Sequence, residues 1–174
     1  MLQQLAQYDA KLCLLVNRTC RAKYVRVSFA MISRLGNGVF WYALMLVLPL
    51  LFAERGLIAA LHMLATALCG LVLYKIIKRR TERPRPCNVY TAITLGADPL
   101  DLYSFPSGHT LHAVSFTVLA VHYFPPLAWL LVPFAALVAA SRLVLGLHYP
   151  TDVLCGALIG AALAVCSLSM VGAL

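Results

Sequence analysis

The stretch DLYSFPSGHTLHAVSF, residues 101–116, marks the point at which an irregular polar segment becomes a long apolar run. Pro106 suits a position at or just before a first helical turn, and Ser107 is a good N-cap residue, so a helix is predicted to begin here. Capping alone does not require the Gly108 and His109 that follow. Because the first N–H groups of a helix have no internal partners, this helix start predicts a cradle for an anion.

The composition excludes an ordinary soluble protein. Of the 174 residues, 62% are hydrophobic and 11% are charged, whereas soluble domains carry about 25% charged residues. The apolar residues lie in long blocks, which predicts an all-α integral membrane protein with one domain over residues 1–174.

Five apolar runs suggest how often the chain crosses the membrane. A helical span needs about 20 residues, and the first run is shorter than that. Val25–Gly36, which contains Arg26 and Arg34, is therefore either a separate partial helix or a sixth crossing. We expect a bundle of five to six transmembrane helices. The runs are Gly38–Ala53, Gly56–Ile77, Ser107–Phe124, Leu127–Leu147 and Thr151–Gly172.

The N-terminal residues 1–24 do not have the pattern of a signal peptide. Leucines at positions 2, 5, 12 and 15 alternate with polar residues, which predicts an amphipathic helix lying in the membrane interface. A helix packed on the bundle explains the same pattern. The six cysteines have no paired spacing, and we expect neither a disulfide nor a metal site from them.

The connections between runs are short except for one, the 28 residues from Lys78 to Phe105. A long polar segment in such a compact chain predicts a functional loop over residues 78–106. It begins in KIIKRRTERPRP, residues 75–86, which has six cations and one acid. This cluster is either a basic patch for anionic lipid headgroups or a binding site for a phosphate. The net charge of +8 is explained in this way without nucleic acid.

A third polar cluster, SRLVLGLHYPTD, occupies residues 141–152. Arg142 ends an apolar run, where a charge is either functional or reaches for the interface. His148 and Asp152 are four residues apart, so the carboxylate can hold one imidazole nitrogen while the other acts as a nucleophile or base. The remaining histidines, at positions 62, 112 and 122, lack such partners, and we interpret them as structural.

Helices that alternate in direction bring these three clusters to one side of the membrane. Several cations, a helix start and two histidines, one with an orienting acid, predict phosphoryl transfer through a histidine intermediate. We expect no metal and no cofactor, because the cations neutralise the developing charge. The residues brought together are Lys78, Arg85, Ser107, Gly108, His109, Arg142, His148 and Asp152.

With these motifs the sequence resembles the type 2 phosphatidic acid phosphatase family, membrane lipid phosphatases related to vanadium haloperoxidases. The family motifs K-x6-R-P, P-S-G-H and S-R-x5-H-x3-D match at residues 78–86, 106–109 and 141–152 in order and without a gap. The first motif offers two arginines, and only Arg85 has the correct spacing from Lys78. Arg83 is left as a possible second phosphate contact.

The resemblance implies a role for each matched residue. His148 would attack phosphorus, Asp152 would orient it, and His109 would protonate the leaving oxygen and later help to activate water. The resemblance also implies a six-helix bundle, of which this chain would be a short bacterial member. The phosphoryl oxygens would be held by Lys78, Arg85, Ser107, Gly108 and Arg142.

The substrate implied by the resemblance is a lipid phosphate. Undecaprenyl diphosphate is favoured, followed by phosphatidylglycerophosphate, phosphatidic acid or lipid A. The same residues suit a lipid phosphotransferase, and a non-enzymatic protein that binds anionic lipid would explain the cations alone. We expect the bacterial inner membrane, with the site facing the periplasm or exterior. The positive-inside rule would place the basic side in the cytoplasm, but phosphate binding explains many of those cations.

Overall fold

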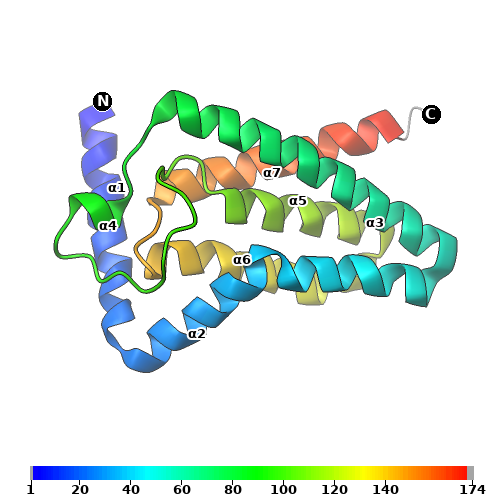
Figure 1. The fold of residues 1–174 in the computed structure, drawn as a ribbon, viewed down its shortest axis with the longest axis horizontal. Helices are drawn as coiled ribbons and strands as arrows, with labels where there is room; N and C mark the ends of the chain where they lie inside the picture. Colours follow the sequence, from blue (N-terminus) through cyan, green and yellow to red (C-terminus); the bar gives the residue numbers. More distant parts are fainter. Residues whose placement is uncertain (1, 172–174) are drawn as a thin grey trace.

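The computed structural model describes residues 2–171, and helices make up most of them (Figure 1). The prediction of an all-helical protein is confirmed. Residue 1 and residues 172–174, the ends of the predicted domain, lie outside the described part. The longer helices are α1 (Leu2–Asn17), α2 (Lys23–Arg34), α3 (Phe40–Thr81), α5 (Gly108–Tyr123), α6 (Ala128–Val144) and α7 (Pro150–Val171), and the short ones are η1 (Arg18–Arg21), η2 (Leu35–Val39), α4 (Pro86–Val89) and η3 (Pro125–Leu127).

Helix α3 is a hairpin of two helical arms rather than one rod (Figure 1). The backbone leaves the helical conformation at Phe52 and Ala53, between the first two predicted apolar runs. Just after the reversal the start of the second arm lies against the end of the first, and the arms then diverge on either side of α5 (Figure 1). A Cβ atom at Gly56 would lie 2.0 Å from the carbonyl oxygen of Leu48, so only glycine fits there. The two runs therefore form separate helical segments, as predicted.

The arms of α3 lie lengthwise beside α5, α6 and α7, with the α3 reversal and η3 at the same end (Figure 1). The core between them includes the buried Trp41, Met63, Leu119, Leu131 and Val138. Within residues 2–171, three helical stretches are long and apolar enough to cross a membrane. They are Lys23–Thr81, Pro125–Val144 and Pro150–Val171. Helix α2 has 12 residues and continues through η2 into α3. The partial helix and the sixth crossing both stay predictions for that segment.

Helices α5 and α7 approach each other through small residues on α7. A Cβ atom would lie 2.6 Å from the carbonyl oxygen of Ser107 if it were added at Gly156. At Gly160 it would lie 2.3 Å from the carbonyl oxygen of Leu111. Such small residues let two membrane helices pack backbone against backbone. The close packing brings the first turn of α7 to the start of α5, where the N–H of Ser107 donates to the carbonyl of Asp152 at 3.0 Å.

Helix α1 lies across the opposite end of the bundle from the α3 reversal (Figure 1). It packs through a buried stripe that includes Asp9, Cys13 and Asn17, while Leu12 and Leu15 are exposed. The side chains of the other two leucines of the predicted apolar face, at positions 2 and 5, lie outside the described part. Packing on the bundle is thus observed, and contact of the exposed leucines with the interface stays a prediction.

Asn17 fastens the long loop to the bundle. Its amide nitrogen donates to the carbonyls of Thr94 and Val144 at 2.9 and 2.8 Å, and its amide oxygen accepts from the N–H of Thr94 at 2.8 Å. The loop is therefore held over the end of the bundle where α3 and α6 end and α5 and α7 begin (Figure 1). This is the predicted convergence of the three motifs.

Candidate active site

A cavity of about 400 Å³ opens at this end of the bundle. Six of the eight predicted site residues line it: Lys78, Arg85, Gly108, His109, Arg142 and His148. The rest of its wall is largely apolar and includes Trp41, Leu64, Leu71, Tyr74 and Phe116. The cavity thus joins a cationic floor to an apolar wall, an arrangement suited to a ligand with a charged head and an apolar tail.

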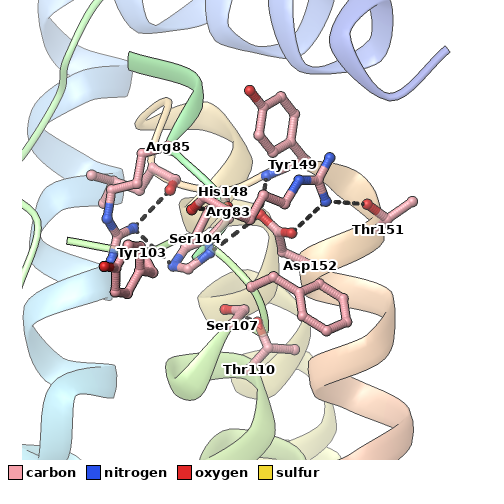
Figure 2. A network of polar contacts seen from close by, with 12 residues as sticks. Arg83, Arg85, Tyr103, Ser104, Ser107, Thr110, His148, Tyr149, Thr151 and Asp152 are labelled. Atoms are coloured by element: carbon pink, nitrogen blue, oxygen red, sulfur yellow. Dashed lines mark hydrogen bonds and ion pairs between the residues drawn. The ribbon is translucent and has the colours of Figure 1, made fainter. Parts of the chain in front are cut away.

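His148 lies in the short loop between α6 and α7, with its side chain buried (Figure 2). Its Nε2 atom is 3.2 Å from Nη1 of Arg85. Because a guanidinium group can only donate, Nε2 is the acceptor and the ring proton is on Nδ1. Burial, and then the charges of Arg142 and Arg85, hold the pKa of His148 well below its usual range. His148 is therefore neutral at neutral pH, with its lone pair on the nitrogen beside the cations.

Asp152 lies behind the other ring nitrogen of His148. Its Oδ2 atom is 3.6 Å from Nδ1, which is longer than a hydrogen bond, and Nδ1 has no hydrogen-bond partner among residues 2–171. The carboxylate is held by the N–H of Tyr149 at 2.8 Å and by Nη1 of Arg83 at 2.6 Å. Such contacts often shorten only when substrate binds, so the position suits an orienting role.

Arg83, left by the sequence as a second phosphate contact, lies on the Asp152 side of His148 (Figure 2) and does not line the cavity. Its guanidinium group joins two buried carboxylates, Asp152 at 2.6 Å and Asp9 at 2.5 Å. It also stacks over the ring of Tyr149, 4.0 Å from the ring centroid. Burial alone would lower the pKa of Arg83, but the two carboxylates outweigh it and raise that pKa. Arg83 thus positions Asp152.

Asp9 has no counterpart in the sequence motifs. It lies on α1 and accepts hydrogen bonds from the N–H and the hydroxyl of Thr151 at 2.9 and 2.5 Å. The N-terminal helix therefore holds the start of α7 and, through Arg83, the carboxylate beside His148. Asp9 shares the buried face of α1 with Cys13 and Asn17, at a spacing of four residues. That spacing indicates a packed face, but it does not identify the partner of the acid.

Replacing Arg83 by methionine should destabilise the protein strongly. The change leaves two carboxylates buried without their cation, which costs about 3–5 kcal/mol in the free energy of unfolding. Thermal unfolding in detergent measures the effect, with Arg80→Met as the control because Arg80 is exposed at the end of α3. Adding Asp9→Asn to Arg83→Met should recover part of the loss. Equal melting temperatures for Arg83→Met and Arg80→Met would contradict the assignment.

The two cations of the first motif share a loop carboxylate that sequence reasoning did not single out. Lys78 Nζ lies 2.7 and 2.8 Å from the two carboxylate oxygens of Asp101. Arg85 Nη2 lies 2.6 Å from Oδ1 of the same group. Burial would raise the pKa of Asp101, but Lys78 and Arg85 outweigh it and lower that pKa. Asp101 is therefore a carboxylate anion bound between the two cations.

Arg142 completes the cationic floor from the side of α6. It is buried, one guanidinium nitrogen donates to the hydroxyl of Ser33 on α2, and its Nε atom has no partner among residues 2–171. A second cavity of about 580 Å³ adjoins it and is also lined by Arg34, Asn37 and His109. Arg142 and His109 thus line both cavities.

The P-S-G-H motif lies at the start of α5, and its residues take different positions. His109 and Gly108 line the cavity. Ser107 is fully buried, and its hydroxyl pairs with that of Thr110 at 2.9 Å (Figure 2). The expected anion cradle consists of the N–H groups of Ser107, Gly108 and His109. The N–H of Ser107 donates to the backbone carbonyl of Asp152. The expectation is therefore wrong for Ser107, and Gly108 and His109 are left. Phosphate binding by the Ser107 hydroxyl stays a prediction.

Two histidines interpreted as structural have different surroundings. The Nδ1 atom of His62 lies 2.9 Å from the hydroxyl of Tyr123, which agrees with a structural role. His112 lines the cavity one turn after His109, with its ring edge-on to Tyr74. The helical spacing of three residues between His109 and His112 could have predicted this shared face.

The described residues contain no group of three or more His, Cys, Asp or Glu side chains that could hold a metal ion. All six cysteines are free. The charge facing the cavity comes instead from Lys78, Arg85 and Arg142, which are all buried.

Comparison with known proteins relates this site to one family. The PAP2 superfamily model matches residues 56–174. Undecaprenyl-diphosphatase BcrC of Bacillus subtilis is 37% identical over 89 residues, which cover 51% of this chain and 46% of that protein. The chain thus spans about half the length of the curated relatives it matches first.

Two solved structures are similar over nearly the whole chain. Aquifex aeolicus LpxE has a TM-score of 0.79 and 28% identity, with 91% of this chain and 93% of that chain covered. The transmembrane PAP2 type phosphatidylglycerolphosphate phosphatase from Bacillus subtilis has a TM-score of 0.78 and 26% identity, with 98% and 88% covered. With its long apolar helices, this chain is an integral membrane protein.

Proposed function

Since this chain belongs to the PAP2 superfamily, we propose that it is a membrane lipid phosphatase that works through a phosphohistidine intermediate. The observation that carries the proposal is the neutral, buried His148, whose unprotonated Nε2 lies beside a cation in a cavity with an apolar wall. A nucleophilic nitrogen, a cationic floor and space for a lipid tail are what hydrolysis of a lipid phosphate requires.

In the first step, Nε2 of His148 forms a bond to phosphorus while the bond from phosphorus to the leaving oxygen breaks. His109 donates a proton to that oxygen, and Asp152 stabilises the positive charge that develops on the imidazole ring. In the second step, water attacks phosphorus, the phosphorus–nitrogen bond breaks and His109 takes a proton from the water. Lys78, Arg85 and Arg142 hold the phosphoryl oxygens throughout.

We propose a lipid diphosphate as the preferred substrate, with undecaprenyl diphosphate first. Bacillus subtilis BcrC, with 37% identity in the shared region, is named for that activity. The apolar wall of the cavity, which includes Leu64 and Leu71, suits a hydrocarbon chain. Phosphatidylglycerophosphate, phosphatidic acid and lipid A remain the other members of the substrate class.

We also propose five membrane crossings, formed by the two arms of α3 and by α5, α6 and α7. Helix α2 leads through η2 directly into the first arm of α3, so we count these three segments together as one crossing. The catalytic end would face the periplasm or exterior of a bacterial inner membrane. Three of the cations at this end, Lys78, Arg83 and Arg85, are engaged with carboxylates, so they are not counted in the positive-inside comparison.

The function is tested by phosphate release from the purified protein in detergent with EDTA. The panel contains undecaprenyl diphosphate, phosphatidylglycerophosphate, phosphatidic acid and lipid A. We expect release that is unaffected by EDTA, fastest with undecaprenyl diphosphate and inhibited by orthovanadate, which mimics the transition state of phosphoryl transfer. Loss of all release in EDTA, with recovery on adding Mg²⁺, would contradict a metal-free mechanism.

A phosphotransferase would use the same first step and pass the phosphoryl group to a lipid hydroxyl instead of water. The panel is therefore repeated with an acceptor lipid, and the lipid products are separated. A phosphorylated acceptor in place of inorganic phosphate would identify a transferase. Failure of the protein to bind orthovanadate or to release phosphate would favour a non-enzymatic lipid-binding protein.

A further inference from the structure

The two cations of the first motif, Lys78 and Arg85, are bound to a carboxylate of the chain itself. Lys78 has three donor positions, and its Nζ atom contacts both carboxylate oxygens of Asp101 and the carbonyl of Tyr103, at 2.7, 2.8 and 2.9 Å. Arg85 Nη2 contacts the same carboxylate at 2.6 Å, and its Nε contacts the backbone carbonyl of Asp101 at 2.9 Å. One loop residue thus binds both cations.

The carboxylate of Asp101 has the chemistry of the ligand that the cations are predicted to bind. A carboxylate and a phosphoryl group both present two oxygens to a guanidinium fork. Asp101 lines the same cavity as His109 and His148, and its side chain is 39% exposed. Asp101 therefore lies on the path of an incoming anion. Arg83, in contrast, does not line the cavity.

The loop holds this carboxylate in place through its backbone. The N–H of Ser104 donates to the carbonyl of Arg83 at 2.8 Å, and Tyr103 forms an isolated antiparallel bridge with Pro84. Tyr103 and Ser104 are thus paired through their backbone with the segment that carries Arg85. Displacing the carboxylate does not require breaking this pairing, because its contacts are made by the side chain of Asp101.

Arg85 also covers the nucleophile while Asp101 holds it. Its Nη1 atom donates toward the lone pair of His148 Nε2 at 3.2 Å, the atom that must attack phosphorus. An oxyanion that takes the place of Asp101 would draw Arg85 to its own oxygens. Binding of substrate and release of the nucleophile would then be one event.

We propose that Asp101 is an internal competitor for the phosphoryl site, bound to Lys78 and Arg85 until a ligand anion displaces it. The inference rests on the proposed function and adds a selective role to the loop. Every anion must displace the carboxylate, but a lipid substrate also buries its tail against the apolar wall. The carboxylate lowers the affinity for both anions by the same factor. Inorganic phosphate has no tail whose burial offsets that loss, so the product is the ligand left weakly bound.

The test is the affinity of the full-length protein for orthovanadate and inorganic phosphate, measured by calorimetry in detergent. Asp101→Asn keeps the shape of the side chain and removes its charge. If the carboxylate occupies the site in about nine of ten molecules, its removal tightens binding about tenfold. Asp98→Asn is the matched control, because Asp98 is exposed three residues earlier in the same loop, and its affinity should equal that of the wild type.

Two results would overturn the inference. If Asp101 only positions Lys78 and Arg85, Asp101→Asn binds vanadate more weakly than the wild type. Equal affinity, or equal tightening in Asp98→Asn, would show that Asp101 does not compete. A wild-type structure with vanadate bound is the second measurement and needs no variant. We expect the carboxylate to have left both cations, and vanadate bound with those contacts intact would contradict the proposal.

Failure of this inference differs from failure of the proposed function. Wild-type protein that releases phosphate from lipids, with no tightening in Asp101→Asn, refutes the competitor alone. Wild-type protein and both variants that neither bind an oxyanion nor release phosphate refute both.

Discussion

His148→Ala should abolish phosphate release from every lipid of the panel while leaving the protein folded. The change removes Nε2, the only atom proposed to bond to phosphorus, and water would have to attack the substrate directly. Loss of a nucleophile lowers kcat by at least about 10³-fold in comparable enzymes. Initial rates in detergent measure the loss. His122→Ala is the control, because His122 is exposed at the far end of α5 and should retain wild-type activity.

Folding and the intermediate can be followed separately from turnover. Within residues 2–171 the His148 side chain has a hydrogen bond to Arg85 alone, and the backbone of its loop is held by other bonds, so we expect the variant to stay folded. Acid-labile labelling by a substrate with radioactive phosphate, quenched during turnover, should appear in the wild type and be absent from His148→Ala. Retained phosphatase activity or labelling in this variant would refute a phosphohistidine on His148.

Asp152→Asn should lower kcat by about 10²–10⁴-fold, as the loss of an orienting carboxylate does in catalytic triads. The amide has one oxygen where the carboxylate has two, yet Tyr149 N–H and Arg83 each donate to a separate oxygen. In the variant the NH₂ group takes one of these two positions. It then faces either the Arg83 guanidinium, or the N–H of Tyr149 together with Nδ1 of His148. The charge that stabilises the imidazole ring in the transition state is lost as well. Steady-state kinetics on undecaprenyl diphosphate measure the effect.

Asp9→Asn is the matched control for that variant. It alters the same Arg83 cluster from α1 without touching His148, so it should lower the melting temperature with a much smaller loss of kcat. A fall in kcat as large as that of Asp152→Asn would mean that Asp152 acts only as part of the cluster that supports the loop. Different effects on stability and rate would separate orientation of His148 from packing of α1.

Much of the fold could be predicted from the sequence because its signals are local. A hydrophobic run of helical length can be recognised from the residues of one segment alone. The first two such runs form the two arms of α3, which meet at Phe52 and Ala53. The loop connections are short except for residues 78–106, so the motif ends had to meet at one end of the bundle. The pairing of His148 with Asp152 could be predicted from their spacing of four residues, without knowledge of distant contacts.

Only the tertiary structure decided which acids pair with the cations Lys78, Arg83 and Arg85. Asp9 reaches Arg83 and Thr151 from α1, and Asp101 reaches Lys78 and Arg85 from the loop. Ion pairs of this kind depend on where two segments pass each other in space, and residue spacing along one segment does not record that. The sequence by itself determined the helical membrane fold and the chemical types at the site. The path of the loop and the docking of α1 decided which acids hold its cations.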